Sequence, residues 1–302
     1  MYSLRLKIRH EKFVLVGIAM VVALFAFPSP GSAEPVKQVI RIAGSTTVLP
    51  IASRVAERLN GKQNRAAYTV NTGGSGVGVH GIGKGLIQIG LVSREISDDE
   101  KKRYPETDFK VHLAGRDAVA CVVSSEVYRD GVTHLSRQQI RDIYLGKTAN
   151  WKEVGGPDRR IVVIDKERHR GTRHVFMQYI FGDPHARAPG AMLVTGSNNE
   201  EQTKIAQSDS AIGMLSFAWI NEDVVGIGIR VGSRIIEPGQ ETVLNETWPI
   251  MRDLNFITAG EPKGPVKEFI DYVLGAEGQK IVQQAGYIPA RMQPSRIASI
   301  ER

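Results

Sequence analysis

The stretch that decides the fold reads Gly44-Ser45-Thr46-Thr47-Val48-Leu49-Pro50. It follows the apolar run 39–43, which predicts a strand, and it precedes residues 51–59, whose apolar positions recur at helical spacing. A glycine turn and three hydroxyl side chains therefore stand between a strand and a helix. Because the N-terminus of a helix leaves backbone N–H groups unpaired, this arrangement can bind an oxyanion. Taken alone, the stretch is also explained by a helix cap supplied by Ser45 or Thr46.

Strand and helix patterns alternate along the rest of the chain. Strands are predicted at residues 68–72, 86–92, 111–113, 118–123, 161–164, 211–215 and 248–258. Helices are predicted at residues 79–86, 135–146, 171–181, 264–274 and 276–285. Such alternation is typical of βαβ units with a mostly parallel sheet, so we predict an α/β fold.

The N-terminal segment has the pattern of a secretory signal peptide. Four basic residues between Arg5 and Lys12 precede the apolar run 13–27, and a triplet of small residues ends at Ala33. We expect cleavage after Ala33 and export of the remaining chain as a soluble protein. The apolar run is shorter than the ~20 residues that a membrane-spanning helix needs, and an uncleaved N-terminal anchor is the alternative.

Charge and cysteine content exclude several kinds of function. Residues 1–33 carry four basic and one acidic residue, so their removal lowers the formal net charge from +7 to +4. This mild and dispersed surplus fits a small anionic ligand and does not indicate nucleic-acid binding. The single cysteine, Cys121, lies in an apolar run and has no partner for a disulfide within the chain. We expect it to be a small buried side chain.

Three stretches share one design, in which a strand end is followed by glycine and hydroxyl residues and then by a helix. They are residues 44–50, 73–78 and 166–174. Each helix N-terminus favours an anion by ~0.3–1 kcal/mol at an exposed site. Three such termini pointing at one place would form a neutral, donor-rich site for a tetrahedral oxyanion. The glycine spacing is neither that of a Walker A loop nor that of a dinucleotide-binding loop.

The order of these motifs resembles that of the periplasmic phosphate-binding proteins of ABC transporters. The resemblance is carried by residues 44–50, 74–76, 89–94, 139–147, 150–158, 171–173, 248–250, 266–270, 278–280 and 286–289. It covers about residues 39–291, nearly all of the chain after the predicted signal peptide. It implies a two-lobe, Venus-flytrap α/β fold in which each lobe is a mixed, mostly parallel sheet flanked by helices.

The resemblance also implies how the chain is divided and what it does. Lobe 1 would hold residues 34–117 and 248–302, and lobe 2 would hold residues 118–247. The protein would capture inorganic phosphate between the lobes in the periplasm. It would deliver the phosphate, as a monomer, to the membrane permease subunits of an ABC importer, and lobe closure would be what the transporter reads. It would perform no catalysis and would need no metal or cofactor.

Carried over position by position, the resemblance implies a set of ligand contacts made by hydroxyl, backbone N–H and charged groups. The set is Ser45, Thr46, Thr47, Ser75, Gly76, Ser93, Arg94, Asp117, Lys166, Arg170, Gly171 and Thr172. A local or inter-lobe ion pair is the alternative role for Arg94. Asp117 could accept the proton that phosphate keeps and sulfate lacks. Its alternatives are a hinge salt bridge with Arg116 or a role in a turn.

The third loop departs from the family pattern at two positions. The family usually has arginine where this chain has Lys166 and serine where it has Arg170. Because lysine cannot make a bidentate contact with an oxyanion, either the guanidinium of the site has moved to Arg170 or the ligand carries more charge. Alternatively, Arg170 points to solvent and Lys166 pairs with Glu167 or another acid. Gln88 also replaces the aspartate that is usual there.

The sequence is compatible with two rival functions. The departures at residues 88, 166 and 170 are compatible with the same fold binding a different oxyanion or acting as a phosphate sensor. The other rival is a secreted phosphatase, which only the anion site supports. The sequence contains no G-x-S-x-G elbow that would identify a nucleophile and its base, which argues against this enzyme.

Overall fold

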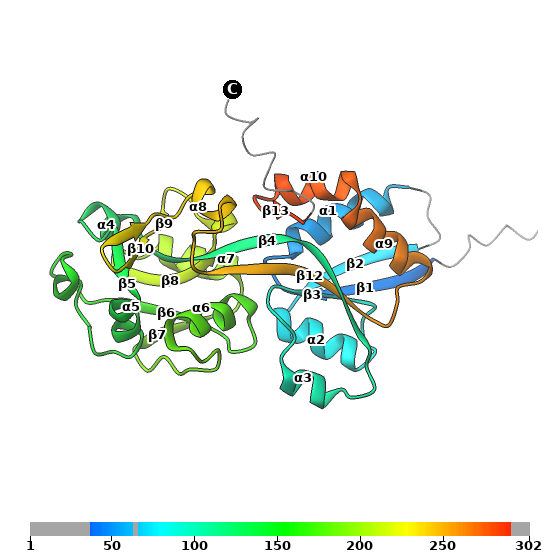
Figure 1. Ribbon diagram of the computed structural model, residues 1–302, viewed down its shortest axis with the longest axis horizontal. Helices are drawn as coiled ribbons and strands as arrows, with labels where there is room; N and C mark the ends of the chain where they lie inside the picture. The colour runs from blue at the N-terminus through cyan, green and yellow to red at the C-terminus, as the bar shows by residue number, and fades with distance from the viewer. Residues whose placement is uncertain (1–36, 63–65, 291–302) are drawn as a thin grey trace, which may run out of the picture. The chain divides into compact units, whose positions relative to one another are not determined.

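A computed structural model describes residues 37–62 and 66–290 (Figure 1). The predicted signal peptide, residues 1–33, lies outside these residues. The described part begins with the strands β1 (Gln38–Gly44), β2 (Ala66–Thr72) and β3 (Ile89–Val92) and the helices α1 (Leu49–Asn60), α2 (Ser75–Gly83) and α3 (Asp98–Arg103). The predicted strand–turn–helix unit around Gly44 is confirmed.

The longest strand of the described chain is β4 (Phe109–Ser124), where the sequence predicted two strands at 111–113 and 118–123. That prediction is wrong because the intervening residues also pair. β12 (Met251–Ala259) runs antiparallel to β4 and places Arg252 opposite Asp117, and β13 (Ile288–Pro289) pairs with β4 at Gly115. A charged pair across the two strands therefore lies where the sequence predicted a break between two strands.

The segment between β4 and β12 holds many short elements. Its helices are α4 (Ser125–Arg129), α5 (Arg137–Tyr144), η1 (Trp151–Val154), α6 (Gly171–Phe181), α7 (Asn198–Ala206), η2 (Phe217–Trp219) and α8 (Gln240–Leu244). Its strands are β5 (His134–Ser136), β6 (Val162–Lys166), β7 (Ala191–Thr195), β8 (Ala211–Ser216), β9 (Val224–Gly226), β10 (Gly228–Val231) and β11 (Arg234–Ile236). After β12 come α9 (Gly264–Leu274) and α10 (Ala276–Gln284), both as predicted.

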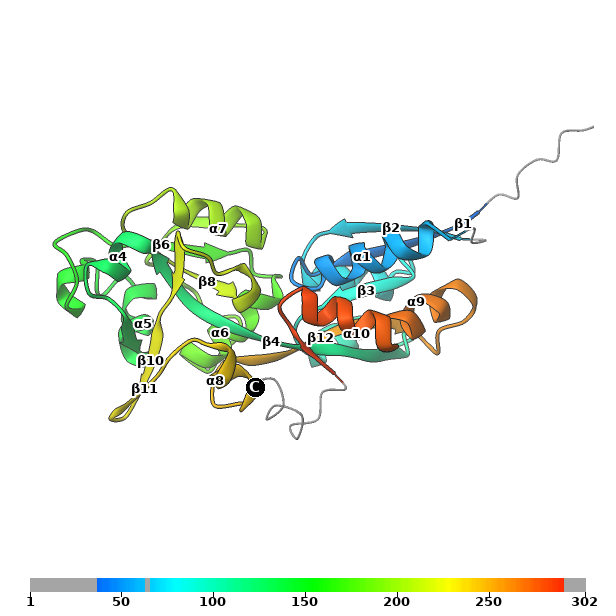
Figure 2. The same ribbon diagram turned by 90° about the horizontal axis from the view of Figure 1, so that it is seen from above.

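Ten strands of the described chain form one mixed sheet that runs through β4. Its order is β2-β1-β3-β12-β4-β8-β6-β7, and β13 and β9 also pair with β4. The pairs β1–β2, β1–β3, β6–β8 and β6–β7 are parallel, whereas the pairs that involve β4 or β12 are antiparallel. Parallel strands therefore lie at both ends of the sheet, and β4 and β12 connect them (Figures 1 and 2).

The two largest groups of buried side chains form separate cores on the two sides of this connection. One core contains Ile40, Leu254 and Phe256, and we call the elements around it lobe 1. The other contains Trp151 and Ala118, and we call the elements around it lobe 2. In lobe 1, α1, α9 and α10 cover one face of the sheet and α2 covers the other (Figure 1). The exact residue limits of the lobes stay a prediction.

Trp248 and Cys121 are both buried in the core of lobe 2, as predicted for Cys121. Trp248 is 1% exposed and donates its indole N–H to the carbonyl oxygen of Val119 at 2.9 Å, which ties the end of lobe 2 to β4. Cys121 is fully buried in the same core. In residues 37–62 and 66–290, no helix has the length and apolar character needed to cross a bilayer.

Gly44 allows the end of β1 to approach β3 closely. Its φ is +142°, a backbone conformation that residues with a side chain rarely adopt. A Cβ at this position would lie 2.2 Å from the carbonyl oxygen of Leu91. The next residue, Ser45, donates its N–H to that same oxygen at 2.8 Å. The glycine of the opening stretch is therefore required by the junction of strand and helix.

We predict that Gly44→Ala lowers the free energy of unfolding by about 3 kcal/mol or more, because backbone strain and a clash with a strand add together. Urea denaturation followed by circular dichroism measures the change. Gly239→Ala is the control, since its φ is −168° and a Cβ there would meet nothing within 4 Å. Equal stability of the two variants would contradict the role given to Gly44.

Candidate functional site

A small polar cavity lies where several helices begin. It is lined by Ser45, Thr46, Thr47, Gly74, Ser93, Lys166, Arg170, Gly171, Thr172, Gly196 and Asn198. These residues stand at the starts of α1, α2, α6 and α7 and at the ends of β3 and β6. The structure thus brings the three predicted loops to one place and adds a fourth. Lobe 1 supplies the first two helix starts, and lobe 2 supplies the others.

The fourth loop was missed by sequence reasoning. It is the segment Gly196-Ser197-Asn198 between β7 and α7, where Ser197 caps the helix by accepting from the N–H of Glu200 at 3.1 Å. Asn198 donates its side-chain amide to the hydroxyl oxygen of Thr47 at 3.1 Å, across the two lobes. The sequence does indicate a helix start here, because Ser197 is followed three residues later by Glu200. This spacing is the pattern of a capped helix start.

Hydroxyl groups of lobe 1 are bonded to one another beside the cavity. Ser45 donates its hydroxyl to the oxygen of Ser93 at 2.9 Å and accepts the N–H of Thr47 at 3.2 Å. Ser75 lies behind this row, where its hydroxyl oxygen accepts the N–H of Ser93 at 3.0 Å. Gly76, also named by the sequence, donates its N–H to the carbonyl oxygen of His169 in lobe 2 at 3.1 Å.

Lys166 forms an ion pair with Glu201 of α7, and both side chains are almost completely buried. Burial lowers the pKa of Lys166 and raises that of Glu201, and the attraction between the two charges opposes both shifts. Glu201 also accepts the N–H of Met214 at 2.7 Å. The structure therefore adopts the alternative in which Lys166 pairs with an acid, although that acid is Glu201 and not Glu167.

Arg170 turns back onto its own loop at the edge of the cavity. Its Nε and Nη2 donate to one carboxylate oxygen of Glu167 at 2.8 and 2.6 Å, and its side chain is 14% exposed. It also covers Gly74, where a Cβ would lie 2.7 Å from the Arg170 Cδ. Because Gly74 has a φ of +87°, glycine suits both the turn and this close contact.

Two further residues named by the sequence are engaged outside the cavity lining. Arg94 makes a bidentate ion pair with Glu100, with both distances 2.7 Å. Burial would raise the pKa of Glu100, but the bonds and charge of Arg94 outweigh it and hold that pKa below its ordinary value. Asp117 accepts from Arg252 at 2.7 and 2.9 Å and from the hydroxyl of Ser216 at 2.8 Å. Its partner is thus Arg252 and not Arg116.

Arg252 was not named by the sequence, yet it lies directly behind the cavity. Its Nη2 donates to the hydroxyl oxygen of Thr47 at 3.1 Å, and its Nη1 donates to that of Thr172 at 2.9 Å. The only indication of its role in the sequence is a charged residue within the apolar strand 248–258. The residues that Arg252 contacts lie far away in the sequence. The cations at the site therefore each have a carboxylate partner, and the cavity offers mainly uncharged donors.

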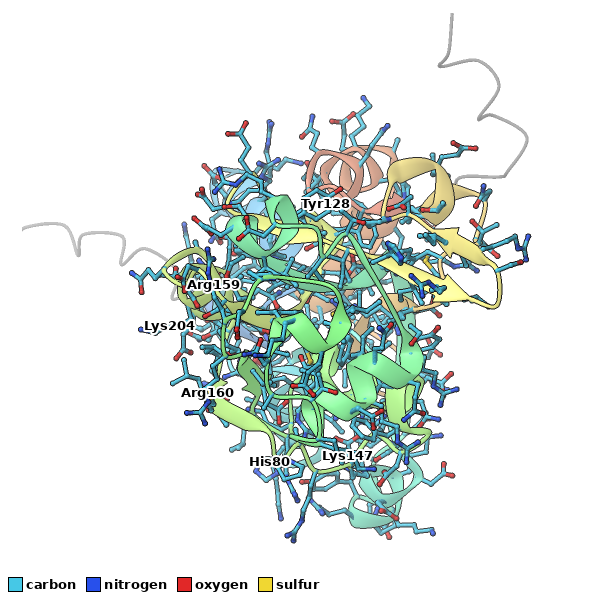
Figure 3. The ribbon with its side chains drawn as sticks, turned by 90° about the vertical axis from the view of Figure 1, so that its left-hand side faces the viewer. His80, Tyr128, Lys147, Arg159, Arg160 and Lys204 are labelled. Carbon is cyan, nitrogen blue, oxygen red and sulfur yellow. The ribbon has the colours of Figure 1, made fainter. Side chains whose placement is uncertain are left out.

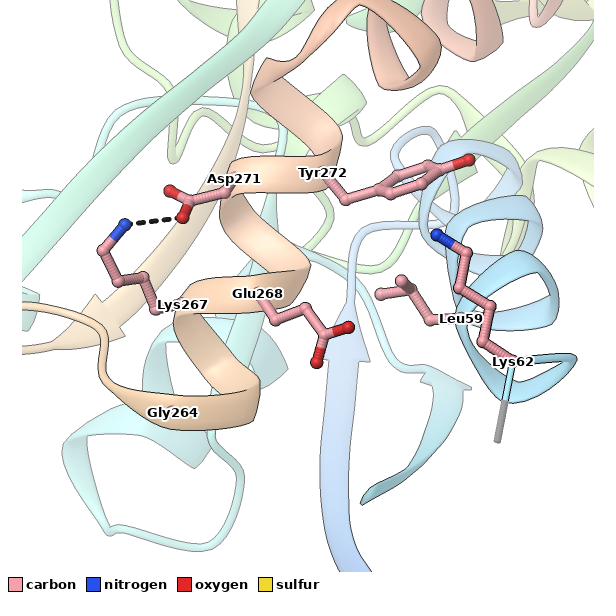
Figure 4. A pocket seen from close by; sticks show the side chains of 7 residues that line it. All are labelled: Leu59, Lys62, Gly264, Lys267, Glu268, Asp271 and Tyr272. Atoms are coloured by element: carbon pink, nitrogen blue, oxygen red, sulfur yellow. Dashed lines mark hydrogen bonds and ion pairs between the residues drawn. The ribbon is translucent and has the colours of Figure 1, made fainter. Parts of the chain in front are cut away.

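A more open hollow lies elsewhere, between α9 and the end of α1. Figure 4 shows Lys62, Lys267, Asp271 and Tyr272 there. Its charged groups are engaged, since Lys267 pairs with Asp271 at 2.5 Å and the Lys62 Nζ lies 5.3 Å from the ring centre of Tyr272. This hollow has no converging helix starts, so it is not the candidate site.

Exposed cations on lobe 2 also stand apart from the cavity. Figure 3 labels Lys147, Arg159, Arg160 and Lys204 on this lobe, and none of them lines the cavity. Arg159 has a carboxylate partner of its own, Asp130, at 3.2 Å. Within the described ranges, no group of three or more His, Cys, Asp or Glu side chains is arranged to hold a metal ion.

Two lobes joined by β4 and β12, with a polar cavity at helix starts from both, define a two-lobe solute-binding protein. The profile of the PBP superfamily domain matches residues 29–277. The phosphate-binding protein PstS of Bacillus subtilis is 30% identical over 251 residues, which are 83% of this chain and 80% of that protein. PstS of Borreliella burgdorferi is 27% identical over 261 residues, 83% of this chain and 90% of that protein.

Solved structures agree with this assignment. A Clostridium perfringens protein crystallised with bound phosphate has a TM-score of 0.75 and 28% identity, covering 84% of this chain and 100% of that one. An ABC-type phosphate transport receptor from Vibrio cholerae has a TM-score of 0.66 and 28% identity, covering 82% and 99%. The chain therefore belongs to the PBP superfamily and, within it, to the PstS-like proteins.

We predict that Glu201→Leu lowers the free energy of unfolding by about 3–5 kcal/mol, because it leaves the Lys166 ammonium buried without its partner. Adding Lys166→Met should recover much of that loss, since neither charge of this buried pair then remains. Chemical denaturation of the single and double variants measures both effects. Lys267→Ala, in an exposed pair with side chains 58% and 59% exposed, is the control and should change stability little. A double variant no more stable than Glu201→Leu would contradict this account.

Proposed function

We propose that this protein binds inorganic phosphate between its two lobes and delivers it to an ABC importer in the membrane. One observation carries the proposal: helix starts and hydroxyl groups from both lobes meet at a single cavity whose neighbouring cations are already paired. A buried anion needs donors for its oxygens, and helix N-termini supply them without adding a full charge. The relatives named PstS and the phosphate-bound structure from Clostridium perfringens support the choice of phosphate.

The same proposal includes the remaining expectations from the sequence. Of the twelve residues named there, the eight that line the cavity form the ligand site. Lobe 1 holds residues 34–117 and 248–302, and lobe 2 holds residues 118–247. The protein is exported by its signal peptide to the periplasm, acts as a monomer and catalyses no reaction. Its similarity to substrate-binding proteins supports the export and the absence of catalysis.

A different oxyanion is the second candidate, and the surroundings of Asp117 favour it. The two oxygens of Asp117 already accept from Arg252 and Ser216, and none of the residues that line the cavity within the described chain is Asp or Glu. A carboxylate acceptor is one means of preferring phosphate, which keeps a proton, over sulfate. Selectivity therefore has to be measured together with affinity.

We predict that isothermal titration with phosphate gives one site per chain with micromolar or tighter affinity, a binding free energy of about −8 kcal/mol or better. Parallel titrations use sulfate and an organic phosphate. Heat with sulfate and none with phosphate would support the second candidate and overturn phosphate as the ligand. Turnover of a phosphate ester by the purified protein would instead indicate an enzyme.

We further predict that Gly171→Ala weakens phosphate binding by about tenfold or more, equal to 1.4 kcal/mol or more. A Cβ at Gly171 would lie 2.4 Å from the hydroxyl oxygens of both Ser75 and Ser93, so α6 could not approach lobe 1 as closely. Gly61→Ala, at the end of α1 with nearest atoms 3.4 Å away, is the matched control and should bind like the wild type. Equal phosphate affinity of the two variants would show that phosphate binding does not need this close contact between Gly171 and lobe 1.

A further inference from the structure

We propose that Arg252 is the positioning residue of the anion site, which directs hydroxyl groups of both lobes toward the ligand and couples lobe closure to binding. The inference rests on the proposed function. No motif of the resemblance includes this residue, and it does not line the cavity. Its role follows from the contacts of its guanidinium group.

The guanidinium is held rigidly between the two strands that connect the lobes. Arg252 of β12 lies opposite Asp117 of β4, and both side chains are 1% exposed. Its Nε and Nη2 donate to the same oxygen of Asp117 at 2.9 and 2.7 Å, while the other oxygen of Asp117 accepts from Ser216 of β8. Asp117 thus fixes the plane of the guanidinium, and its remaining N–H groups point toward the site.

Thr47 shows what this orientation does. A threonine hydroxyl has one hydrogen to donate and two lone pairs that accept. In Thr47, both lone pairs are used, by Arg252 Nη2 at 3.1 Å and by the amide of Asn198 at 3.1 Å. Its hydrogen must therefore point away from both donors, and Thr47 is part of the cavity lining. Arg252 makes this hydroxyl a dedicated donor for an anion.

Thr172 extends the arrangement to lobe 2. Arg252 Nη1 donates to its hydroxyl oxygen at 2.9 Å and lies 3.4 Å from that of Ser93 in lobe 1. One guanidinium therefore contacts hydroxyl groups at the starts of α1 and α6, which belong to different lobes. If the lobes separated, Thr172 would move away from Arg252 Nη1 and this hydrogen bond would be lost. The bond therefore stabilises the closed arrangement of the lobes, in which the anion is bound.

The competing explanation is that the Asp117–Arg252 pair only strengthens the connection between the lobes. The two explanations differ in what happens to a folded variant. A purely structural pair changes unfolding but not phosphate affinity. A positioning residue changes phosphate affinity in a way that depends on the hydroxyl it orients.

The test is a double-mutant cycle of phosphate affinity by titration calorimetry, with Arg252→Lys, Thr172→Val and the double variant. Lysine keeps a charge for Asp117 but cannot contact Asp117, Thr47 and Thr172 together. We expect Arg252→Lys to weaken binding by about tenfold or more, and Thr172→Val to weaken it distinctly less in the Arg252→Lys background than in the wild type. Arg116→Lys is the matched control and should bind phosphate as the wild type does. Arg116 precedes Asp117 in β4, and its side chain is 46% exposed.

Thermal unfolding without phosphate establishes that each variant is folded. If Arg252→Lys does not fold, Asp117→Asn takes its place, because it keeps the shape but removes the charge that orients the guanidinium. It should weaken phosphate binding although Asp117 does not line the cavity. If the wild type binds phosphate and the folded variants bind it with the same affinity, this inference is overturned and the proposed function stands. Strictly additive effects of the two substitutions on phosphate affinity would have the same consequence. A wild-type protein that binds no phosphate would overturn the proposed function, and this inference with it.

Discussion

The ion pair between Asp117 and Arg252 is the interaction on which the rest of the structure depends. It joins β4 and β12, the strands that pass between the two lobes, and both of its side chains are 1% exposed. Removing two charges from water costs several kcal/mol for each ion, so such a pair persists only when its hydrogen bonds are nearly complete. Here Ser216, Thr47 and Thr172 complete them. The bonds that satisfy the pair are also the bonds that connect it to the cavity.

The same principle explains why lysine is acceptable in the ligand loop. The ammonium of Lys166 is paired with Glu201 and also donates to the carbonyl oxygen of Ser197 at 3.3 Å, so it holds the start of α7 against the end of β6. Arg173, the next residue after Thr172, forms another buried pair with Asp165 at 2.9 Å. Charges around the cavity are thus used to fix helix starts, and most of the residues that line the cavity are uncharged.

The sequence predicted the features that depend on local patterns. Gly44, the hydroxyl groups after it and the helix starting at Gly171 could be read from strand ends, turn residues and periodicity, and the structure confirms these elements. It could not predict which charges meet. Arg252 contacts Thr47 from 205 positions away, and Asn198 contacts it from 151 positions away, so no spacing rule relates them. β4 was divided wrongly because its polar centre, residues 115–117, pairs with β12 and so continues the strand.

We propose that donors from both lobes, fixed by paired charges, surround one bound anion. A crystal structure of the protein grown with phosphate tests it most directly. We expect a phosphate in the cavity, with its oxygens within hydrogen-bonding distance of the starts of α1, α6 and α7. Arg252 should still be bound to Asp117 and Thr172. A phosphate held elsewhere, or held by Lys166 after that residue has left Glu201, would contradict the account.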